Sequence, residues 1–222
     1  SFALIAYATA WLRCHYPDVF ICALLNAQPM GFYSPATIVE DAIRHGVEIH
    51  PIDVTVSEWD CTLEPSSINI EGHNKPQRRF GVRMGLRYVK DLSKDRDWQR
   101  IEVARAEQPF TTMTDFTRRT GLDDRMLQRL AEVGAFGAFE ANRRSALWQV
   151  QGFATLRDMS LPMLAEDQLP VFRSLSNFQT INWDYQFSGH STHGHPLEPL
   201  REMLMAQGLP NAEMVLQMRD GQ

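Results

Sequence analysis

The apolar residues of the first 28 positions have helical spacing. Residues 2–15 mix small side chains with large apolar ones, which predicts a helix that another helix or a substrate can approach closely. Residues 18–28 (DVFICALLNAQ) are almost wholly apolar, so the helix they predict must be buried around most of its circumference. Pro29 ends this helix. The sequence therefore predicts two consecutive helices at its start.

A third helix is predicted after a tight turn at Met30-Gly31. Ser34 is placed to cap this helix, and Pro35 occupies its first turn, where a missing N–H costs no hydrogen bond. Gly46 is a typical helix end. The apolar face of the helix consists of Ile38, Val39, Ala42 and Ile43.

After Gly46 the pattern changes to β-branched residues in period-two alternation. This pattern predicts extended chain that ends in a short strand at residues 60–63, with further strands at 68–70 and 80–86. The fold class predicted for the whole chain is mainly α with a small antiparallel β-sheet, an α+β protein.

Residues 87–105 have the spacing of a helix-hairpin-helix motif, in which two short helices flank a tight turn. The backbone N–H groups of such a turn receive a phosphate oxygen without reading the base. Here the turn is Asp91-Leu92-Ser93, so both motif glycines are missing and a carboxylate stands where phosphate would approach. A hairpin kept only for packing is one alternative. The other is phosphate neutralisation by side chains, for which the candidates are Arg87, Lys90, Lys94, Arg96 and Arg100.

A second hairpin is predicted further along the chain. Thr114 and either Asp123 or Asp124 are expected to cap two helices, the first of which ends at Gly121. The second helix has an inner face of Met126, Leu127, Leu130 and Ala131.

A glycine turn at residues 134–137 follows, and then Arg143 and Arg144 at the start of another helix. Arginines in a first turn oppose the helix dipole, and an anion in front of them would explain their presence. Gly134, Gly137, Arg143 and Arg144 are therefore candidate DNA-binding residues. The alternative is that the arginines pair with nearby acids such as Glu140.

The charge distribution modifies this interpretation. The 222 residues are 44% hydrophobic, enough for a buried core, and carry a net charge of −5, which by itself argues against a nucleic-acid partner. Residues 75–105, however, hold ten basic and four acidic side chains, whereas residues 1–74 hold two and nine. This segment is a candidate phosphate-facing patch, with a solvated surface as the alternative.

Other features exclude several classes of protein. No run of 18 apolar residues exists, so no membrane association is predicted, and a cytoplasmic protein is expected. Three irregularly spaced cysteines are too few for a disulfide framework or a zinc site. His190, His193 and His195 lack a Cys or carboxylate at helix-face spacing, so we predict no metal site. Residues 151–179 are expected to form a surface linker, and residues 197–207 a helix.

Two stretches carry a family resemblance. FALIAYATAWLRCHYP (residues 2–17) and LLNAQPMGFYSPATIVEDAIRHGVEIHPIDV (residues 24–54) resemble the fingers region of bacterial C-family DNA polymerases, the family of the polymerase III alpha subunit. Residues 26–33 (NAQPMGFY) are similar to the error-prone, damage-response branch rather than the replicative one. Residues 130–148 also resemble a family signature, LAxxGAFxxxxxxRRxALW. Asp91 and Ser93 depart from the family pattern, where glycine is common.

The resemblance implies a domain organisation and a function. Residues 1–75 would be the distal fingers, residues 76–155 the helix-hairpin-helix DNA-binding region, and residues 156–222 a connector to an OB-fold domain outside this chain. The full-length protein would be a DNA-directed DNA polymerase, a nucleotidyltransferase active in translesion synthesis and repair. Tyr7, Trp11 and Arg13 are candidates for a nucleotide-proximal role, because aromatic and cationic side chains can hold a base or phosphate; helix packing is the alternative.

The implied chemistry requires two Mg²⁺ ions held by palm carboxylates. No closely spaced Asp pair lies on an apolar strand here, so we expect no catalytic residue and no cofactor in this chain, which alone should be inactive. The expected partners are primer-template DNA and, for the full-length enzyme, the incoming dNTP, with accessory translesion proteins and the sliding clamp as further candidates. A non-catalytic DNA-binding module or a structural interaction module is the alternative.

Overall fold

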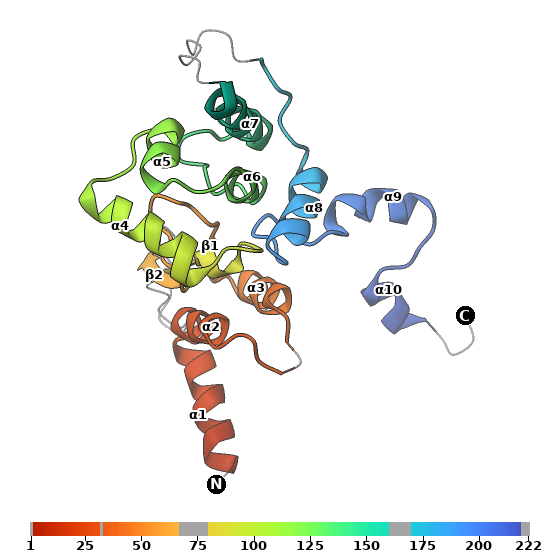
Figure 1. Ribbon diagram of the computed structural model, residues 1–222. Helices are drawn as coiled ribbons and strands as arrows, with labels where there is room; N and C mark the ends of the chain where they lie inside the picture. The colour runs from red at the N-terminus through yellow and green to blue at the C-terminus, as the bar shows by residue number, and fades with distance from the viewer. Residues whose placement is uncertain (1, 32, 67–79, 160–169, 219–222) are drawn as a thin grey trace.

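The computed structural model describes residues 2–31, 33–66, 80–159 and 170–218, with the backbone alone for 153–159. Its first three helices have the predicted positions: α1 (Phe2–His15), α2 (Pro17–Asn26) and α3 (Pro35–Arg44). Ser34 caps α3 as predicted, because its hydroxyl accepts a hydrogen bond from Thr37 N. Ile43 lies off the buried face and is exposed. In Figure 1, α1 projects from the body of the molecule, and it buries none of its residues.

The sheet is mixed rather than purely antiparallel. Its order is β1-β3-β2, with β1 parallel to β3 and β2 antiparallel to β3. The strands are β1 (Ile49–His50), β2 (Thr62–Pro65) and β3 (Phe80–Arg83). The predicted strand at 68–70 lies outside the described residues.

The strand β1 was not predicted because two residues are too few to show alternation. It pairs with β3 at Val82 and Arg83, and a Cβ atom on the adjacent Gly81 would lie 2.6 Å from His50 Nε2. The predicted third strand is shorter than expected and ends at Arg83, because residues 86–88 form a 3-10 turn, η1 (Leu86–Tyr88). The prediction of a mainly helical protein with a small sheet is confirmed.

The hairpin region is a layer of helices above the sheet in Figure 1. It comprises a π-helical turn and four helices: η2 (Lys94–Trp98), α4 (Gln99–Glu107), α5 (Met113–Thr120), α6 (Asp124–Glu132) and α7 (Arg143–Met159). Thr112 rather than Thr114 caps α5, since Asp115 N donates to its hydroxyl. Asp123 caps α6, and Gly121 ends α5 with a φ of 58°.

The C-terminal part contains more helix than predicted. The expected linker from residue 151 begins inside α7, and α8 (Asn177–Phe187) follows a capping box formed by Ser176 and Gln179. Only three residues of α8 are buried, so its sequence has no sustained apolar period. The predicted helix at 197–207 divides into η4 (Glu198–Leu200) and α9 (Arg201–Ala206), and α10 (Ala212–Gln217) comes after it. Neither α9 nor α10 buries a residue.

One continuous hydrophobic core joins the regions predicted as fingers and hairpins. It runs from Leu25 on α2 through Val82 on β3 to Phe136 after α6 and Phe187 on α8. Phe116 lies edge-on to Phe136, with ring centroids 5.3 Å apart. The division of the chain into three domains, with boundaries at residues 75 and 155, stays a prediction. Among the described residues, no helix is both long and apolar enough to cross a membrane.

Candidate nucleic-acid interface

The turn of the first hairpin contains a residue in the left-handed conformation. Asp91 has a φ of 68°, a value that favours glycine, so the backbone keeps the shape of a glycine turn although the glycine is missing. Its carboxylate pairs with two arginines of α6: Asp91 Oδ2 lies 2.9 Å from Arg125 Nη2 and 3.6 Å from Arg129 Nε. The predicted repulsive carboxylate is therefore held by the second hairpin.

The backbone donor that follows this turn is already occupied. Ser93 N donates to Asp97 Oδ2 at 3.0 Å, and Asp97 also accepts from Arg96 Nε at 2.9 Å. Burial opposes ionisation of Asp97, but these hydrogen bonds and the Arg96 charge lower the pKa of its carboxyl. An internal carboxylate thus stands at the helix start, where an external phosphate would meet the backbone N–H.

The predicted basic residues Arg87 and Lys90 of the first hairpin donate hydrogen bonds to backbone carbonyls of distant elements. Arg87, whose side chain is 22% exposed, donates to the carbonyls of Asn26 and Gln28 at the end of α2 and to Asp60 Oδ1. Lys90 Nζ donates to the carbonyl of Gln186. Arg87 therefore connects the end of α2 to the first hairpin through hydrogen bonds. DNA contact by Arg87 and by Lys90 stays a prediction.

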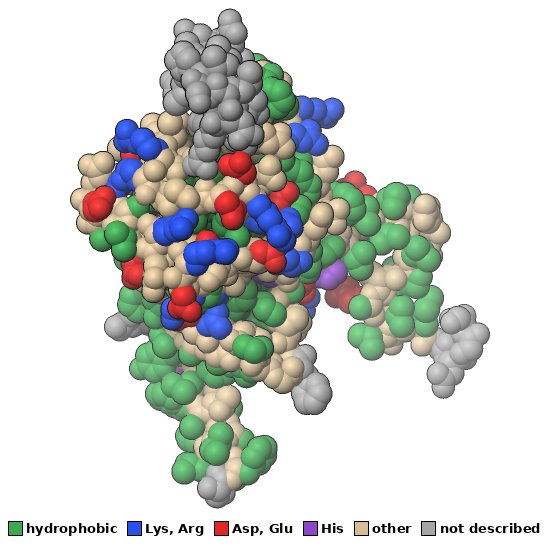
Figure 2. Space-filling view, in the orientation of Figure 1, with side chains coloured by type: hydrophobic (Ala, Val, Ile, Leu, Met, Phe, Trp, Pro, Cys, Tyr) green, Lys and Arg blue, Asp and Glu red, His purple; other side chains and the backbone are tan. Residues whose placement is uncertain are grey.

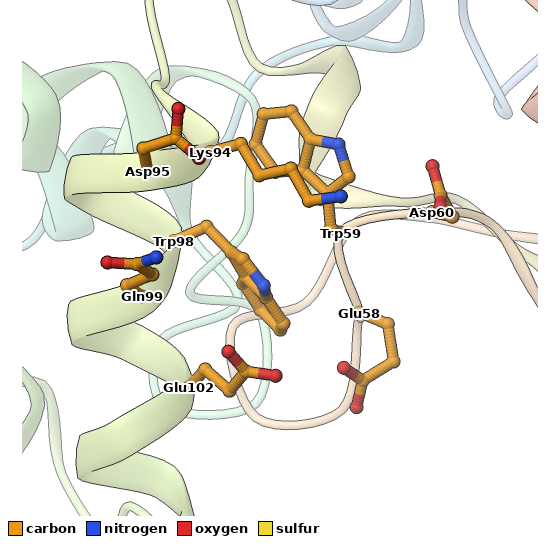
Figure 3. Close-up of a pocket in the computed structure, with 8 residues that line it drawn as sticks. All are labelled: Glu58, Trp59, Asp60, Lys94, Asp95, Trp98, Gln99 and Glu102. Carbon is orange, nitrogen blue, oxygen red and sulfur yellow. The ribbon is translucent and has the colours of Figure 1, made fainter.

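Lys94 lies at an acidic pocket of about 340 Å³ between α4 and the loop before β2. Figure 3 shows Trp98 of η2 and Glu102 of α4 on one wall of the pocket, and Trp59 and Glu58 on the loop wall. The residues that line it are Glu58, Trp59, Asp60, Lys94, Asp95, Trp98, Gln99 and Glu102. The four carboxylates of the lining repel phosphate, so the pocket itself is not suited to DNA. Lys94 is the basic residue among those that line it.

The glycine turn of the second hairpin has the predicted position. Gly134 has a φ of 78°, and its N–H donates to the carbonyl of Ala131. Ala135 N donates to Leu130 O, and Gly137 N donates to Gly134 O. Three N–H groups of the turn are thus satisfied within the hairpin, so the predicted contacts of Gly134 and Gly137 with phosphate would have to replace existing bonds.

The paired arginines have different environments. Arg143 is only 11% exposed, and its Nη1 lies 2.6 Å from Asp184 Oδ1 on α8. Glu140, the partner considered from sequence, instead accepts a hydrogen bond from Asn142 N. Arg144 is nearer the surface and donates to the carbonyl of Arg173 and to Gln179 Oε1. Arg143 is thus a largely buried ion-pair residue, and DNA contact by either arginine stays a prediction.

Sequence reasoning missed an exposed cation of the second hairpin. Arg125 on α6 is 72% exposed, and Arg96 on the first hairpin is 60% exposed. Figure 2 shows basic side chains interspersed with acidic ones over the face formed by α4, α5 and α6. The signal was present in the helical period, because Arg125 and Arg129 lie opposite the apolar face of Leu127, Leu130 and Ala131.

The predicted nucleotide-proximal residues lie on α1, at the end of the molecule opposite α7 in Figure 1. Tyr7 is exposed, and the ring of Trp11 contacts those of His15 and Tyr16. Arg13 pairs with Asp41 of α3 at 2.8 Å. The structure therefore does not bring Tyr7, Trp11 and Arg13 together with the hairpin residues, and their role stays a prediction.

The three C-terminal histidines have separate partners. His190 is buried against the ring of Tyr88, and burial lowers its pKa. His193 Nδ1 lies 2.9 Å from Asp184 Oδ2, and His195 Nε2 lies 3.8 Å from Glu40 Oε1. Within the part of the chain that the structure describes, no group of three or more His, Cys, Asp or Glu side chains could hold a metal ion. The absence of a metal site stays a prediction.

The hairpin region matches a family model over part of the chain. Residues 46–146 match the model of a family described as a helix-hairpin-helix motif. This match includes the sheet, both turns and the start of α7.

The curated relatives identify the family more closely. The chain is 41% identical to an error-prone DNA polymerase of Methylococcus capsulatus and 42% identical to error-prone DNA polymerase 2 of Agrobacterium fabrum, in both cases over its whole length. It is 39% identical over 99% of its length to an error-prone DNA polymerase of Pseudomonas savastanoi. The chain spans about a fifth of the length of these relatives. The resemblance is confirmed: the chain is homologous to a segment of error-prone DNA polymerases.

Proposed function

We propose that this chain is a duplex-binding section of an error-prone DNA polymerase that acts in translesion synthesis and repair in the bacterial cytoplasm. The observation that carries the proposal is about 40% identity to such polymerases along the whole chain. The helix-hairpin-helix match supports DNA as a partner. The full-length protein would be a DNA-directed DNA polymerase, with the incoming dNTP, accessory translesion proteins and the sliding clamp as further partners.

The polymerase chemistry would lie outside this chain. Two Mg²⁺ ions supply charge stabilisation in nucleotidyl transfer when carboxylates hold them. The described residues do not fit that group, because none of their His, Cys, Asp and Glu side chains gather in threes at metal-binding distance. We therefore assign no catalytic step to this chain and limit its role to holding DNA.

The geometry favours side chains over backbone N–H groups as phosphate ligands. Internal acceptors occupy Ser93 N and the N–H groups of Gly134 and Gly137. Arg96 and Arg125 instead extend from the two hairpins into solvent, although each also pairs with a carboxylate at its base. The Arg125–Asp91 pair is exposed on both sides, and such pairs are weak, about 0–1 kcal/mol, so a phosphate can replace Asp91 at small cost. Arg96 pairs with the buried Asp97, so a phosphate would have to share its guanidinium with that carboxylate.

A first prediction follows for Arg96 and Arg125. Replacing both with Ala should weaken primer-template binding uniformly across sequences and lower the slope of log affinity against log salt by about two. Fluorescence anisotropy at several salt concentrations measures both quantities. Arg44→Ala is the matched control, because Arg44 is 69% exposed but lies on α3, away from the hairpins.

Two outcomes would contradict the proposal at different levels. A wild-type chain that does not bind duplex DNA would support the structural interaction module, which the internally satisfied turn N–H groups also favour. Wild-type binding with an unchanged salt slope in the double variant would keep DNA binding but move it away from these arginines.

A further inference from the structure

The helix α8 and the loop that follows it contact both hairpins and α3. Figure 1 shows α8 beside α6 and α3. On its α3 side, the Tyr185 hydroxyl donates to Glu40 Oε1 at 2.6 Å. On its other sides it contacts Lys90, beside the turn of the first hairpin, and Arg143, which follows the turn of the second hairpin and lies about 40 residues earlier in sequence. This arrangement makes α8 a connection between elements that are distant along the chain.

A buried carboxylate attaches α8 to the second hairpin. Asp184 Oδ1 accepts from Arg143 Nη1 at 2.6 Å, while Asp184 Oδ2 accepts from Ser191 Oγ at 2.7 Å and lies 2.9 Å from His193 Nδ1. Burial opposes ionisation, but these hydrogen bonds and the Arg143 charge lower the pKa of Asp184. Arg143 Nη1 also lies 3.4 Å from the carbonyl of Glu132.

The end of α8 is attached to the first hairpin. Lys90 N donates to the carbonyl of Phe187 at 3.3 Å, and Lys90 Nζ donates to that of Gln186. The rings of Tyr88 and His190 lie edge to face, with centroids 5.3 Å apart. Backbone, side-chain and aromatic contacts all connect the same two segments, so the first hairpin does not depend on one bond for its position against α8.

A third contact joins α6 of the second hairpin to the end of α8. The guanidinium of Arg129 on α6 lies over the ring of Phe187, 5.4 Å from its centroid. The same Arg129 reaches the carboxylate of Asp91 in the first hairpin turn. The two hairpins and α8 thus meet at one place, and Asp184 supplies the only carboxylate there, among the described residues, that holds Arg143.

We propose that Asp184 is a positioning residue that fixes the second hairpin relative to the first, so that both contact one duplex together. The inference rests on the proposed DNA-binding function. Two binding elements held at a fixed spacing bind more tightly than the same elements on a mobile joint, because the second contact is made at high effective concentration and at little entropic cost. Arg143 then contributes to DNA binding through Asp184, without touching phosphate.

The test uses the whole 222-residue chain and the variant Asp184→Asn, which keeps the side-chain shape and removes the charge. Hydrogen exchange of residues 177–193 should become at least tenfold faster. Affinity for a primer-template duplex should fall roughly tenfold, and the slope of log affinity against log salt should become smaller, because one hairpin disengages. A simple loss of folded protein would reduce the binding amplitude without changing that slope.

Two further variants keep the test decisive. Tyr185→Phe breaks the contact of α8 with Glu40 but leaves the hairpin contacts intact, so its salt slope should equal that of the wild type. His193→Ala removes one neighbour of Asp184 from the loop and should shift exchange and slope in the same direction as Asp184→Asn, but less, even if the latter variant does not fold.

The outcomes separate the inference from the function on which it rests. Faster exchange in Asp184→Asn or His193→Ala, with an unchanged salt slope and affinity, would overturn the positioning role and leave DNA binding intact. No duplex binding by the wild-type chain would instead overturn the proposed function and the inference with it.

Discussion

At the scale of single residues, the arginines divide into two groups that the sequence does not distinguish. Arg87, Arg105, Arg119 and Arg143 are largely buried and donate to backbone carbonyls. Arg96, Arg118 and Arg125 extend into solvent. The number of basic residues in a segment is therefore larger than the number of positive charges exposed to DNA. A guanidinium has five N–H donors, so it is well suited to bonding carbonyls and carboxylates inside the fold.

The residue Asp91 is expected to restrain DNA binding. Asp91→Gly should strengthen primer-template binding several-fold, because it removes a negative charge from the turn and releases Arg125 for phosphate. It should change stability little, since relief of about 1 kcal/mol from the left-handed backbone offsets the loss of an exposed ion pair. Anisotropy titrations and urea unfolding measure the two effects.

The variant Asp91→Asn separates charge from backbone conformation. Asn tolerates a positive φ and removes the same charge, so it should give most of the gain in affinity. Unchanged affinity in both variants would show that the carboxylate does not oppose DNA. An Arg125→Ala change added to Asp91→Gly should cancel the part of the gain that comes from the released guanidinium.

At the scale of elements, the glycine turn after α6 serves close packing as well as turn geometry. A Cβ atom on Gly134 would lie 2.4 Å from Arg143 Nε, so the missing side chain is what lets Arg143 reach Asp184. The positive φ of Gly134 adds a second requirement. The same glycine that suggested a phosphate-binding turn thus also allows a buried ion pair to form.

Gly134→Ala should destabilise the protein by about 2 kcal/mol or more, through backbone strain and displacement of Arg143. Urea unfolding followed by circular dichroism measures this loss. Gly152→Ala is the control, because a Cβ there meets nothing within 4 Å and Ala favours the helical interior of α7. Equal stability of the Gly134→Ala variant and the wild type would show that Arg143 can move without cost.

At the scale of the whole molecule, the continuous core has a consequence for the expected domains. Residues from α2 to α8 contribute to one hydrophobic cluster, so a change in the hairpins can alter the packing of α2 and β3. The exposed apolar helices α1, α9 and α10 lie outside this cluster.

The isolated chain should not extend a primer in the presence of Mg²⁺ and all four nucleotides. The reason is that it spans about a fifth of its polymerase relatives and its sequence has no closely spaced Asp pair on an apolar strand. A gel-based extension assay, with an active polymerase as the positive control, measures this. Templated extension by the pure chain would show that the catalytic carboxylates lie within it.

Local signals in the sequence determined much of the helical framework. Ser34 with Pro35, Asp123 and Gly121 predicted helix ends that the structure confirms, and the apolar period of α6 predicted its buried face. Caps and helical periods act between residues three or four positions apart, so they can be read from a short stretch of sequence. The family signature at residues 130–148 can likewise be recognised from a short stretch of sequence.

Only the tertiary structure decided what the functional candidates contact. The partner of Arg143 is Asp184, 41 residues away, and that of Arg87 is the end of α2, about 60 residues away. The short parallel strand β1 and the position of α8 likewise depend on contacts with distant elements. A charged side chain pairs with whichever partner the packed chain brings near, and sequence spacing does not fix that distance. The sequence by itself therefore determined most helices up to the start of α7 and the family resemblance, and the fold decided which cations extend into solvent.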